Sequence, residues 1–249
     1  MAKGVKALKK YEILNANALK LIALVSMVID HVGAMLFPSI LWLRCLGRIA
    51  LPIFAYMVAE GCLHTRNTRK YFLRIFILGL LCQVVFFFVY GTLYLSTLIS
   101  FSLSILAISL LEHLNAETKK PMFVFYNLLV ILFVLVMLCL IKPPHFMDRY
   151  QLMLDYGIYP FAIPIILYFL PTKEWRILAL IPLLYLLSLD FTWEQQFAFF
   201  ALPILLLYNG EKGKANLKHF FYIAYPMHLV LIFIVYVLFF GQNKFLPRI

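Results

Sequence analysis

Long apolar blocks, separated by short polar loops, are the feature that most constrains how this chain can fold. A helix needs about 20 apolar residues to cross the hydrocarbon core of a bilayer. Hydrophobic residues make up 64% of the chain and charged residues only 13%, against roughly one half and one quarter in soluble domains. We therefore predict an all-α, polytopic transmembrane helix bundle that forms a single membrane domain over residues 1–249. The nine expected spans cover residues 19–37, 43–62, 72–90, 95–112, 122–141, 154–170, 176–190, 195–209 and 220–240.

The distribution of lysine and arginine predicts which ends of the spans face the cytoplasm. With nine spans and a cytoplasmic N-terminus, sixteen of the 22 basic residues fall in cytoplasmic segments and four in external segments. Cytoplasmic loops of membrane proteins carry an excess of Lys and Arg, so we predict a cytoplasmic N-terminus and an external C-terminus. The net charge of +11 arises from the same excess of lysine and arginine in cytoplasmic loops. Because the basic residues are dispersed over short loops, we expect no nucleic-acid partner.

The four cysteines favour a structural interpretation. Cys45, Cys62, Cys82 and Cys139 lie in or beside apolar blocks and show no CxxC spacing. A free cysteine in such a place behaves as a small buried hydrophobe. We therefore expect neither a disulfide nor a metal site.

Ionisable residues inside the first two spans are candidates for function, because such groups are costly within a membrane. The first span contains Asp30 and His31, and the second contains Arg44 and Arg48 at a similar depth. Adjacent helix positions point about 100° apart, so we expect Asp30 to pair with Arg48 while His31 points elsewhere. The ion pair could simply lock the two helices together. For His31 we favour chemistry, because a neutral imidazole can take a proton from an attacking group near pH 7.

A second polar cluster follows the second span. Glu60 and His64 lie four residues apart, and the loop HTRNTRK then supplies Arg66 and Arg69. Lys20 stands at the same predicted side of the membrane, at the start of the first span. These charges could serve only to set topology. Alternatively they could form a phosphate cradle, since guanidinium groups bind phosphate oxygens in a bidentate way.

Two segments carry a resemblance to a known family. The stretches LKLIALVSMVIDHVGAMLFP and LGRIALPIFAYMVAEGCLHTRNTRKYFLRI, within residues 17–90, resemble the TraX family, and FFYIAYPMHLVLI at 220–232 resembles it again. That family is named for an inner-membrane protein that acetylates pilin subunits. TraX proteins are in turn similar to the acyltransferase-3 superfamily. Its patterns are matched here by Lys20 and His31, with ten residues between them, and by Arg66-x-x-Arg69, although Glu60-Gly61 replaces the usual Ser-Gly.

The resemblance implies an enzyme of the bacterial cytoplasmic (inner) membrane that transfers an acetyl or similar acyl group. The donor would be acetyl-CoA or another acyl-CoA in the cytoplasm. The acceptor would be an amine or hydroxyl of a peptide, glycan or lipid at the outer face, such as the N-terminus of a pilin. No metal is expected. The implied catalytic residues are His31, Asp30 and Arg48, and the implied donor-binding residues are Lys20, Arg66, Arg69, His64 and Glu60.

The spacing of Lys20 and His31 fits this scheme. Eleven residues span about 16 Å along a helix, which is comparable to the reach of a pantetheine arm. Phosphates held near Lys20 would therefore place a thioester near His31. Residues in the predicted external segments that could help to bind the acceptor are His145, Asp148, Asp155, Asp190 and Glu194.

Two other functions remain open from the sequence. A proton-coupled transporter could use Asp30, His31 and Glu60 as a relay, although no repeat of the kind found in transporters is present. A non-catalytic assembly factor would use the same charges only for packing. Binding of acyl-CoA separates the acyltransferase from both alternatives.

Overall fold

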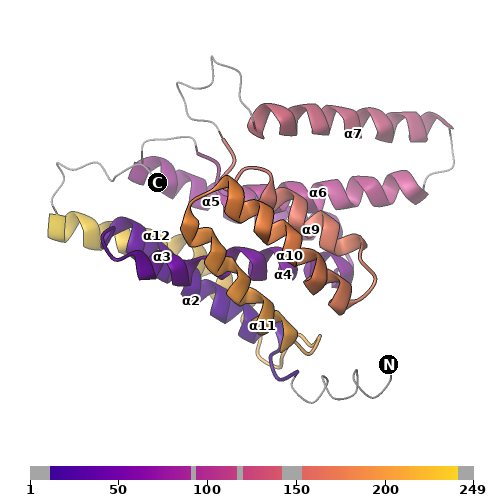
Figure 1. Ribbon diagram of the computed structural model, residues 1–249. Helices are drawn as coiled ribbons and strands as arrows, with labels where there is room; N and C mark the ends of the chain where they lie inside the picture. Colours follow the sequence, from indigo (N-terminus) through magenta and orange to yellow (C-terminus); the bar gives the residue numbers. More distant parts are fainter. Residues whose placement is uncertain (1–11, 91–93, 117–119, 142–152, 241–249) are drawn as a thin grey trace. The chain divides into compact units, whose positions relative to one another are not determined.

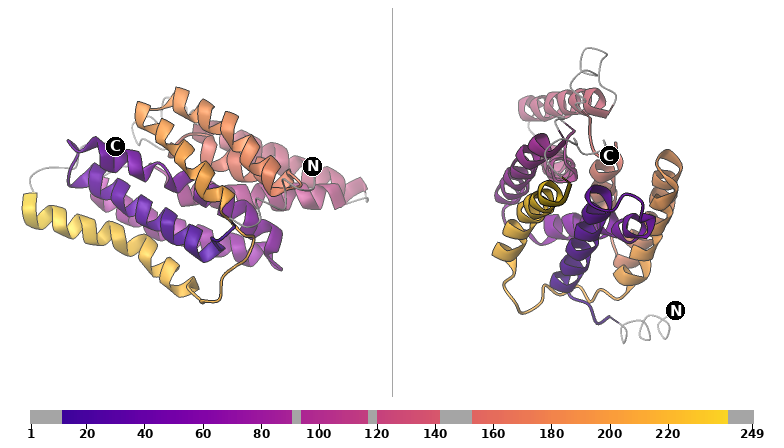
Figure 2. Two further views of the ribbon diagram at one scale, coloured as in Figure 1. Left: turned by 60° about the horizontal axis from the view of Figure 1, so that its bottom comes forward. Right: turned by 90° about the vertical axis from the view of Figure 1, so that its left-hand side faces the viewer.

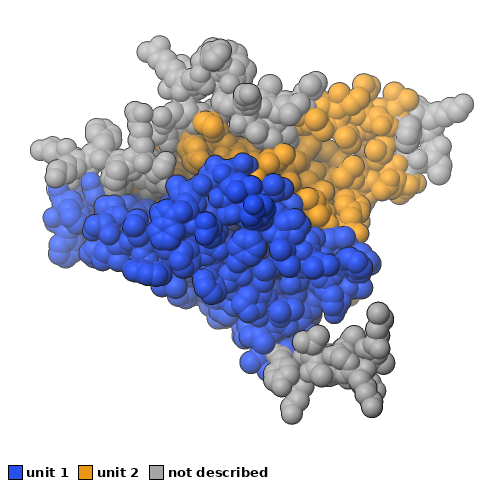
Figure 3. All heavy atoms as spheres, in the orientation of Figure 1, with its two compact units in different colours: residues 1–57, 170–247, 249 blue, residues 58–169, 248 orange. Residues whose placement is uncertain are grey.

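The computed structural model describes residues 12–90, 94–116, 120–141 and 153–240, and within these ranges every extended regular element is a helix (Figure 1). The chain is divided into two compact units, drawn in two colours in Figure 3. The first unit combines residues 1–57 with residues 170–247, and the second comprises residues 58–169. The all-α prediction is confirmed for the described residues.

The first unit contains both ends of the described chain. Its elements are α2 (Ala16–Met35), α3 (Leu41–Gly47), the first half of α4 (Ala50–His64), α10 (Lys173–Asp190), the 3-10 helix η1 (Trp193–Phe200), α11 (Ala201–Leu206) and α12 (Lys218–Phe240). The second unit holds the end of α4, α5 (Thr68–Tyr90), α6 (Thr97–Ala116), α7 (Lys120–Ile141) and α9 (Tyr159–Phe169).

Five of the described helical segments are long and apolar enough to cross a membrane. They are Ala16–Met35, Leu41–His64, Thr68–Val89, Thr97–Ala116 and Lys218–Phe240. Each coincides with an apolar block identified in the sequence, so the chain is a multi-pass membrane protein. The count of nine spans and their orientation stay predictions.

Two of the expected spans are interrupted, and proline explains both breaks. The block at 43–62 is split into α3 and α4, and the block at 195–209 into η1 and α11. In each case the second helix begins with the sequence Ala-Leu-Pro, at Pro52 and Pro203. Proline lacks the N–H that would bond to the carbonyl four residues earlier, and it is tolerated in the first turn of a helix. A new helix therefore starts just before each proline. The segment Leu41–His64 still counts as one span long enough to cross a membrane, but the sequence analysis did not predict the breaks inside the two spans.

The start of α2 is fixed by the loop that joins α11 to α12. Leu14 N–H donates to Leu207 O at 2.9 Å, and Asn209 N–H donates back to Leu14 O at 2.8 Å. Ala16 N–H donates to Glu211 O at 2.7 Å. The bond from Ala16 satisfies one of the N–H groups that a helix start leaves without an intrahelical partner, and the two bonds of Leu14 hold the residues before the helix. The first turn of α2 therefore has a defined position against the loop at 207–217.

Lys173, the first residue of α10, connects this helix by hydrogen bonds to Glu12 and to the end of α11. Its ammonium donates to Glu12 Oε1 at 2.8 Å, to Leu206 O at 2.9 Å and to Tyr208 O at 2.5 Å. The side chains of Lys173 and Glu12 are each only 21% exposed. The charged group therefore neutralises Glu12 and caps carbonyl oxygens at the end of α11.

Replacing Lys173 by methionine should lower the free energy of unfolding of the first unit by about 2 kcal/mol, because charge-assisted hydrogen bonds are lost and Glu12 is left unpaired. The measurement is thermal unfolding of the purified protein in detergent. Lys70→Met, on an exposed position of α5, is the matched control and should leave the midpoint unchanged. Equal midpoints for both variants would show that the Lys173 contacts contribute nothing.

Polar contacts join the helices of the second unit at its turns. Gln83 of α5 donates to Tyr94 O at 2.9 Å and accepts from Ser96 N–H at 3.0 Å, so it closes the turn before α6. Buried Ser104 of α6 donates to Phe161 O of α9 at 2.8 Å. The predicted span at 154–170 becomes helical only from Tyr159. Positive φ angles of 55° at Tyr156 and 57° at Gly157 form a turn before it.

Candidate functional site

The helices α2 and α3 approach each other closely because glycine lies at their contact. A Cβ atom added to Gly47 of α3 would overlap the side chain of Asp30 on α2. A Cβ on Gly33 of α2 would lie 2.7 Å from Leu43 Cβ. The hydroxyl of Ser26 also donates to Leu46 O across the same contact. Small residues allow helix backbones to come together in this way within membranes, and here they place Asp30 against α3.

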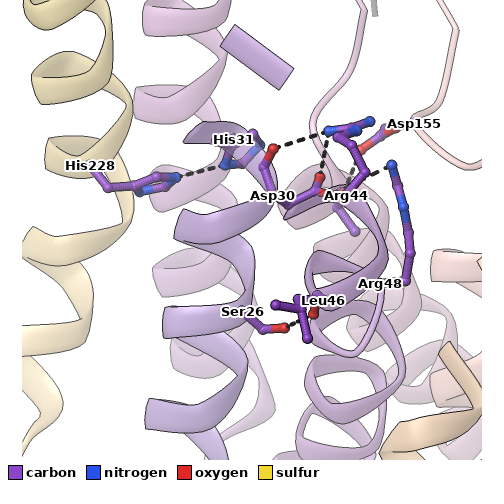
Figure 4. A network of polar contacts seen from close by, with 9 residues as sticks. Ser26, Asp30, His31, Arg44, Leu46, Arg48, Asp155 and His228 are labelled. Carbon is purple, nitrogen blue, oxygen red and sulfur yellow. Dashed lines mark hydrogen bonds and ion pairs between the residues drawn. The ribbon is translucent and has the colours of Figure 1, made fainter. Parts of the chain in front are cut away.

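Asp30 lies between two arginines in the first unit (Figure 4). Arg44 Nη1 is 2.9 Å from Asp30 Oδ2 and also donates to Asp30 O at 3.2 Å. Arg48 Nη2 is 3.5 Å from Asp30 Oδ1. The Asp30–Arg48 pair predicted from the sequence is therefore present, but Arg44 makes the shorter contact. A carboxylate held by two guanidinium groups is well compensated for its burial.

A second carboxylate belongs to the same charged cluster. Glu194 of η1 interacts electrostatically with Arg44, Arg48 and Asp30. Burial alone would raise the pKa of Glu194, but a hydrogen bond from Thr192, a backbone hydrogen bond and the positive charges of Arg48 and Arg44 together lower it. The lowered pKa means that Glu194 stays ionised. Two carboxylates thus balance two guanidinium groups at this end of the first unit.

His31 points away from this charged cluster and meets His228 of α12. His31 Nδ1 lies 3.0 Å from His228 Nε2, and the ring centroids are 5.1 Å apart (Figure 4). The contact joins residues that are separated by 197 positions in the sequence. His228 lies on the buried stripe of α12, together with Tyr225, Leu229 and Ile232.

The hydrogen bonds of His228 fix the proton positions on both neutral rings. His228 Nδ1 lies 3.0 Å from Ala224 O. A carbonyl oxygen can only accept, so Nδ1 of His228 carries the proton and Nε2 is its acceptor nitrogen. His31 must then donate from Nδ1, which leaves Nε2 as its unprotonated nitrogen. This is the tautomer of His31 that can act as a base through Nε2.

His228 was not assigned from the sequence, although it lies in the segment 220–232 that carries the family resemblance. A usable signal was present: His228 is a titratable residue within the last predicted span, residues 220–240. Buried ionisable groups in membrane spans are functional candidates. The contact between His31 and His228 depends on the packing of α12 on α2, which no local sequence pattern predicts.

The residues predicted to bind the donor are divided between the two units. Lys20 lies in the first turns of α2, in the first unit, and is half-buried. The second unit contains Glu60, His64, Arg66 and Arg69. His64 Nδ1 donates to Glu60 O at 2.9 Å and lies 3.8 Å from the Glu60 carboxylate, which is buried. Both Arg66 and Arg69 are exposed to solvent; Arg66 lies in the turn before α5 and Arg69 in the first turn of that helix.

The external residues predicted to help bind the acceptor have varied surroundings. Asp155 accepts a hydrogen bond of 2.7 Å from Thr97 Oγ1 within the second unit. Asp190 is the exposed last residue of α10, and Glu194 belongs to the arginine cluster described above. His145 and Asp148 lie outside the described residues.

Three of the four cysteines are buried, as the interpretation of small apolar residues predicts. Cys45, Cys62 and Cys82 are free and buried. Within the ranges that the structure describes, no group of three or more His, Cys, Asp or Glu residues is placed to hold a metal ion.

Comparison with known proteins gives this geometry a family context. The model of the family described as "TraX protein" matches residues 15–236. A similar protein, the probable fimbrial assembly protein FimC (serogroup H1) of Dichelobacter nodosus, is 24% identical over 251 residues, which cover 88% of this chain and 94% of that protein. The uncharacterized protein RP591 of Rickettsia prowazekii (strain Madrid E) is 34% identical over 68 residues, or 27% of this chain and 25% of that protein. No solved structure matches. Because the family match runs through α2 and most of α12, and so includes both histidines of the pair, the chain belongs to the TraX protein family.

Proposed function

We propose that this protein is a membrane acyltransferase that moves an acetyl or similar acyl group from cytoplasmic acyl-CoA to an amine or hydroxyl at the outer face of the bacterial inner membrane. The observation that carries the proposal is the His31–His228 contact of 3.0 Å. The contact supplies a histidine base in a fixed tautomer. It lies in the outer part of the first predicted span, where helix packing does not require a titratable group. Membership of the TraX family supports the same reaction.

His31 is the general base of the proposed reaction. The acceptor N–H or O–H gives its proton to His31 Nε2 as the acceptor atom bonds to the carbonyl carbon of the thioester. The carbon–sulfur bond then breaks, and the departing sulfur takes the proton from the His31 imidazolium. One acyl group is transferred, one CoA thiol is released, and His31 returns to its neutral form. Positioned general bases of this kind contribute typically about 10²–10⁴-fold to a rate.

The charged cluster beside His31 has two proposed roles. Asp30 is held by Arg44 and Arg48, and this arrangement keeps the outer part of α2 in a fixed rotation, so that His31 faces α12. The two guanidinium groups also provide positive charge close to the base, where negative charge develops on the thioester carbonyl oxygen during transfer. Arg48 and Asp30 thereby support the reaction, while His31 carries out the proton transfer.

His228 is a positioning residue in this scheme, because it accepts from His31 Nδ1 and so keeps Nε2 unprotonated. His228→Leu should lower kcat by about ten- to hundred-fold, since loss of one orienting contact of this kind misplaces the base. His228→Gln should recover part of the activity, because its amide oxygen can take the place of Nε2 as acceptor. The pH profile of kcat should shift in His228→Leu. Equal loss in the Leu and Gln variants, with an unchanged pH profile, would reduce His228 to a packing residue.

A proton-coupled transporter is the second candidate. The same His31–His228 contact, close to Asp30, could pass a proton between neighbouring groups. Reconstituted protein would then carry protons across a vesicle membrane without acyl-CoA. An acyltransferase would instead consume acyl-CoA and conduct no protons on its own.

The acceptor can be identified by comparing cells with and without the protein. We expect mass spectrometry of membrane and secreted components to find an acetylated peptide, glycan or lipid that disappears when the protein is deleted. The name of the Dichelobacter relative refers to fimbrial assembly, so fimbrial subunits are the first peptides to measure. Loss of fimbriae without any change in acylation would favour a non-catalytic assembly factor.

A further inference from the structure

Lys20 and His31 lie on the same face of α2. Eleven residues advance a helix by about 16 Å and return it to within about 20° of the starting direction. His31 faces α12, and α12 packs against α2 in the first unit. Both helices run in the same direction, as Figure 2 shows. The contact between the two histidines lies toward the end of α2 and near the middle of α12. The face of α2 that leads to the candidate base therefore begins at Lys20.

The loop between α11 and α12 is held against the start of this face. Asn17 Nδ2 donates to Ala215 O at 2.7 Å, and Ala16 N–H donates to Glu211 O at 2.7 Å. Gly213 has a φ of 89°, and a Cβ at this position would lie 2.7 Å from Asn15 Oδ1. Glycine is thus needed both for the backbone conformation and for the close approach to α2. Lys212 lies within this fixed segment, between Glu211 and Gly213.

Lys20 and Lys212 are close enough for their positive charges to repel each other. Lys20 is half-buried at the start of α2, whereas Lys212 is exposed on the loop. Glu12, at the same end of the unit, is already paired with Lys173 at 2.8 Å. Two cations held together cost electrostatic free energy, which an anion between them would relieve.

We infer that Lys20 and Lys212 form a phosphate-binding site at the start of α2. The inference rests on the proposed function, and the phosphates are those of the acyl-CoA donor. From this site to His31 the distance along α2 is about 16 Å, a length that a pantetheine arm can cover. Lys20 of α2 thus forms one part of the donor site, and Lys212 of the loop at 209–215 forms the other. The sequence alone did not indicate the part on the loop. An anionic lipid headgroup presents the same phosphate chemistry, so the test must separate the two sources.

The test uses the purified full chain in a neutral detergent, with acetyl-CoA as the probe. Lys212→Gln should weaken binding by about tenfold at low salt, because one charge-assisted phosphate contact is lost at a partly exposed position. The loss should shrink as salt is added. Lys214→Gln is the matched control, since it removes the same charge from the same loop and should bind as the wild type does. In a parallel arm, native mass spectrometry measures phosphatidylglycerol retained by each variant.

Each possible result of this test either supports or overturns the proposed phosphate-binding site. Weaker acetyl-CoA binding in Lys212→Gln but not in Lys214→Gln supports the site. Unchanged binding in Lys212→Gln overturns it, while the acyltransferase proposal stands because the wild type still binds the donor. Loss of retained phosphatidylglycerol with unchanged acetyl-CoA binding shows that the site serves a lipid and overturns the assignment to the donor. A wild type that binds no acetyl-CoA overturns the proposed function itself.

Discussion

His31→Gln is expected to lower the rate of acyl transfer by about 10²–10⁴-fold, the usual contribution of a positioned general base. Glutamine keeps a polar side chain on the face of α2 that meets His228, but its amide cannot take up a proton near neutral pH. The folded state should therefore persist while the chemistry is lost. The measurement is the rate of CoA release from acetyl-CoA by membranes that contain equal amounts of wild-type and variant protein.

His219→Gln provides the matched control for this experiment. His219 is an exposed residue at the start of α12, the helix that also carries His228. Its replacement should leave the rate of CoA release unchanged. Near-normal activity of His31→Gln in correctly inserted protein would remove His31 from the reaction.

Asp30→Ala should reduce the free energy of unfolding by about 3–5 kcal/mol, as happens when one partner of a buried ion pair is removed. Arg44 and Arg48 would be left without the carboxylate that they share, and their side chains are only 18% and 5% exposed. The alanine also leaves empty the space against Gly47. We expect most of the variant protein to unfold or be degraded at temperatures that the wild type tolerates, as measured by thermal unfolding in detergent.

The comparison variants separate charge from packing. Asp30→Asn keeps the volume of the side chain and a hydrogen-bond acceptor, so its loss of stability should be smaller than that of Asp30→Ala. Asp190→Ala removes an exposed carboxylate at the end of α10 and should change stability little. If Asp30→Ala unfolds at the wild-type temperature, the pair of arginines is held by something other than Asp30.

The helices of this protein were predictable from sequence because apolar blocks report local structure directly. The blocks starting near residues 19, 72, 95 and 220 correspond to α2, α5, α6 and α12 with ends that differ by a few residues. The interruptions near Arg48 and Phe200 were missed. Proline was visible at Pro52 and Pro203, but whether a membrane helix bends or restarts at a proline depends on the groups that take up the freed carbonyls.

The candidate site was predictable only where residues are close in sequence. The pairing of Asp30 with Arg48 followed from the depth of two consecutive spans. The shorter contact with Arg44 depends on the rotation of α3 against α2, which the close approach at Gly47 sets. The contact between His31 and His228 depends on the packing of helices at opposite ends of the chain. Hydropathy carries no information on that packing, because lipid and protein offer similarly apolar surroundings.

The central claim is that acyl transfer runs from a donor on one side of the membrane to an acceptor on the other through His31. The most direct test reconstitutes the protein in vesicles with labelled acetyl-CoA on the side of Lys20 and a surface extract from protein-deficient cells on the opposite side. We predict that label reaches the extract, that free CoA stays with the donor, and that His31→Gln transfers none. Label that reaches the extract equally well with His31→Gln, or proton flow through the wild type without any transfer of label, would contradict the claim.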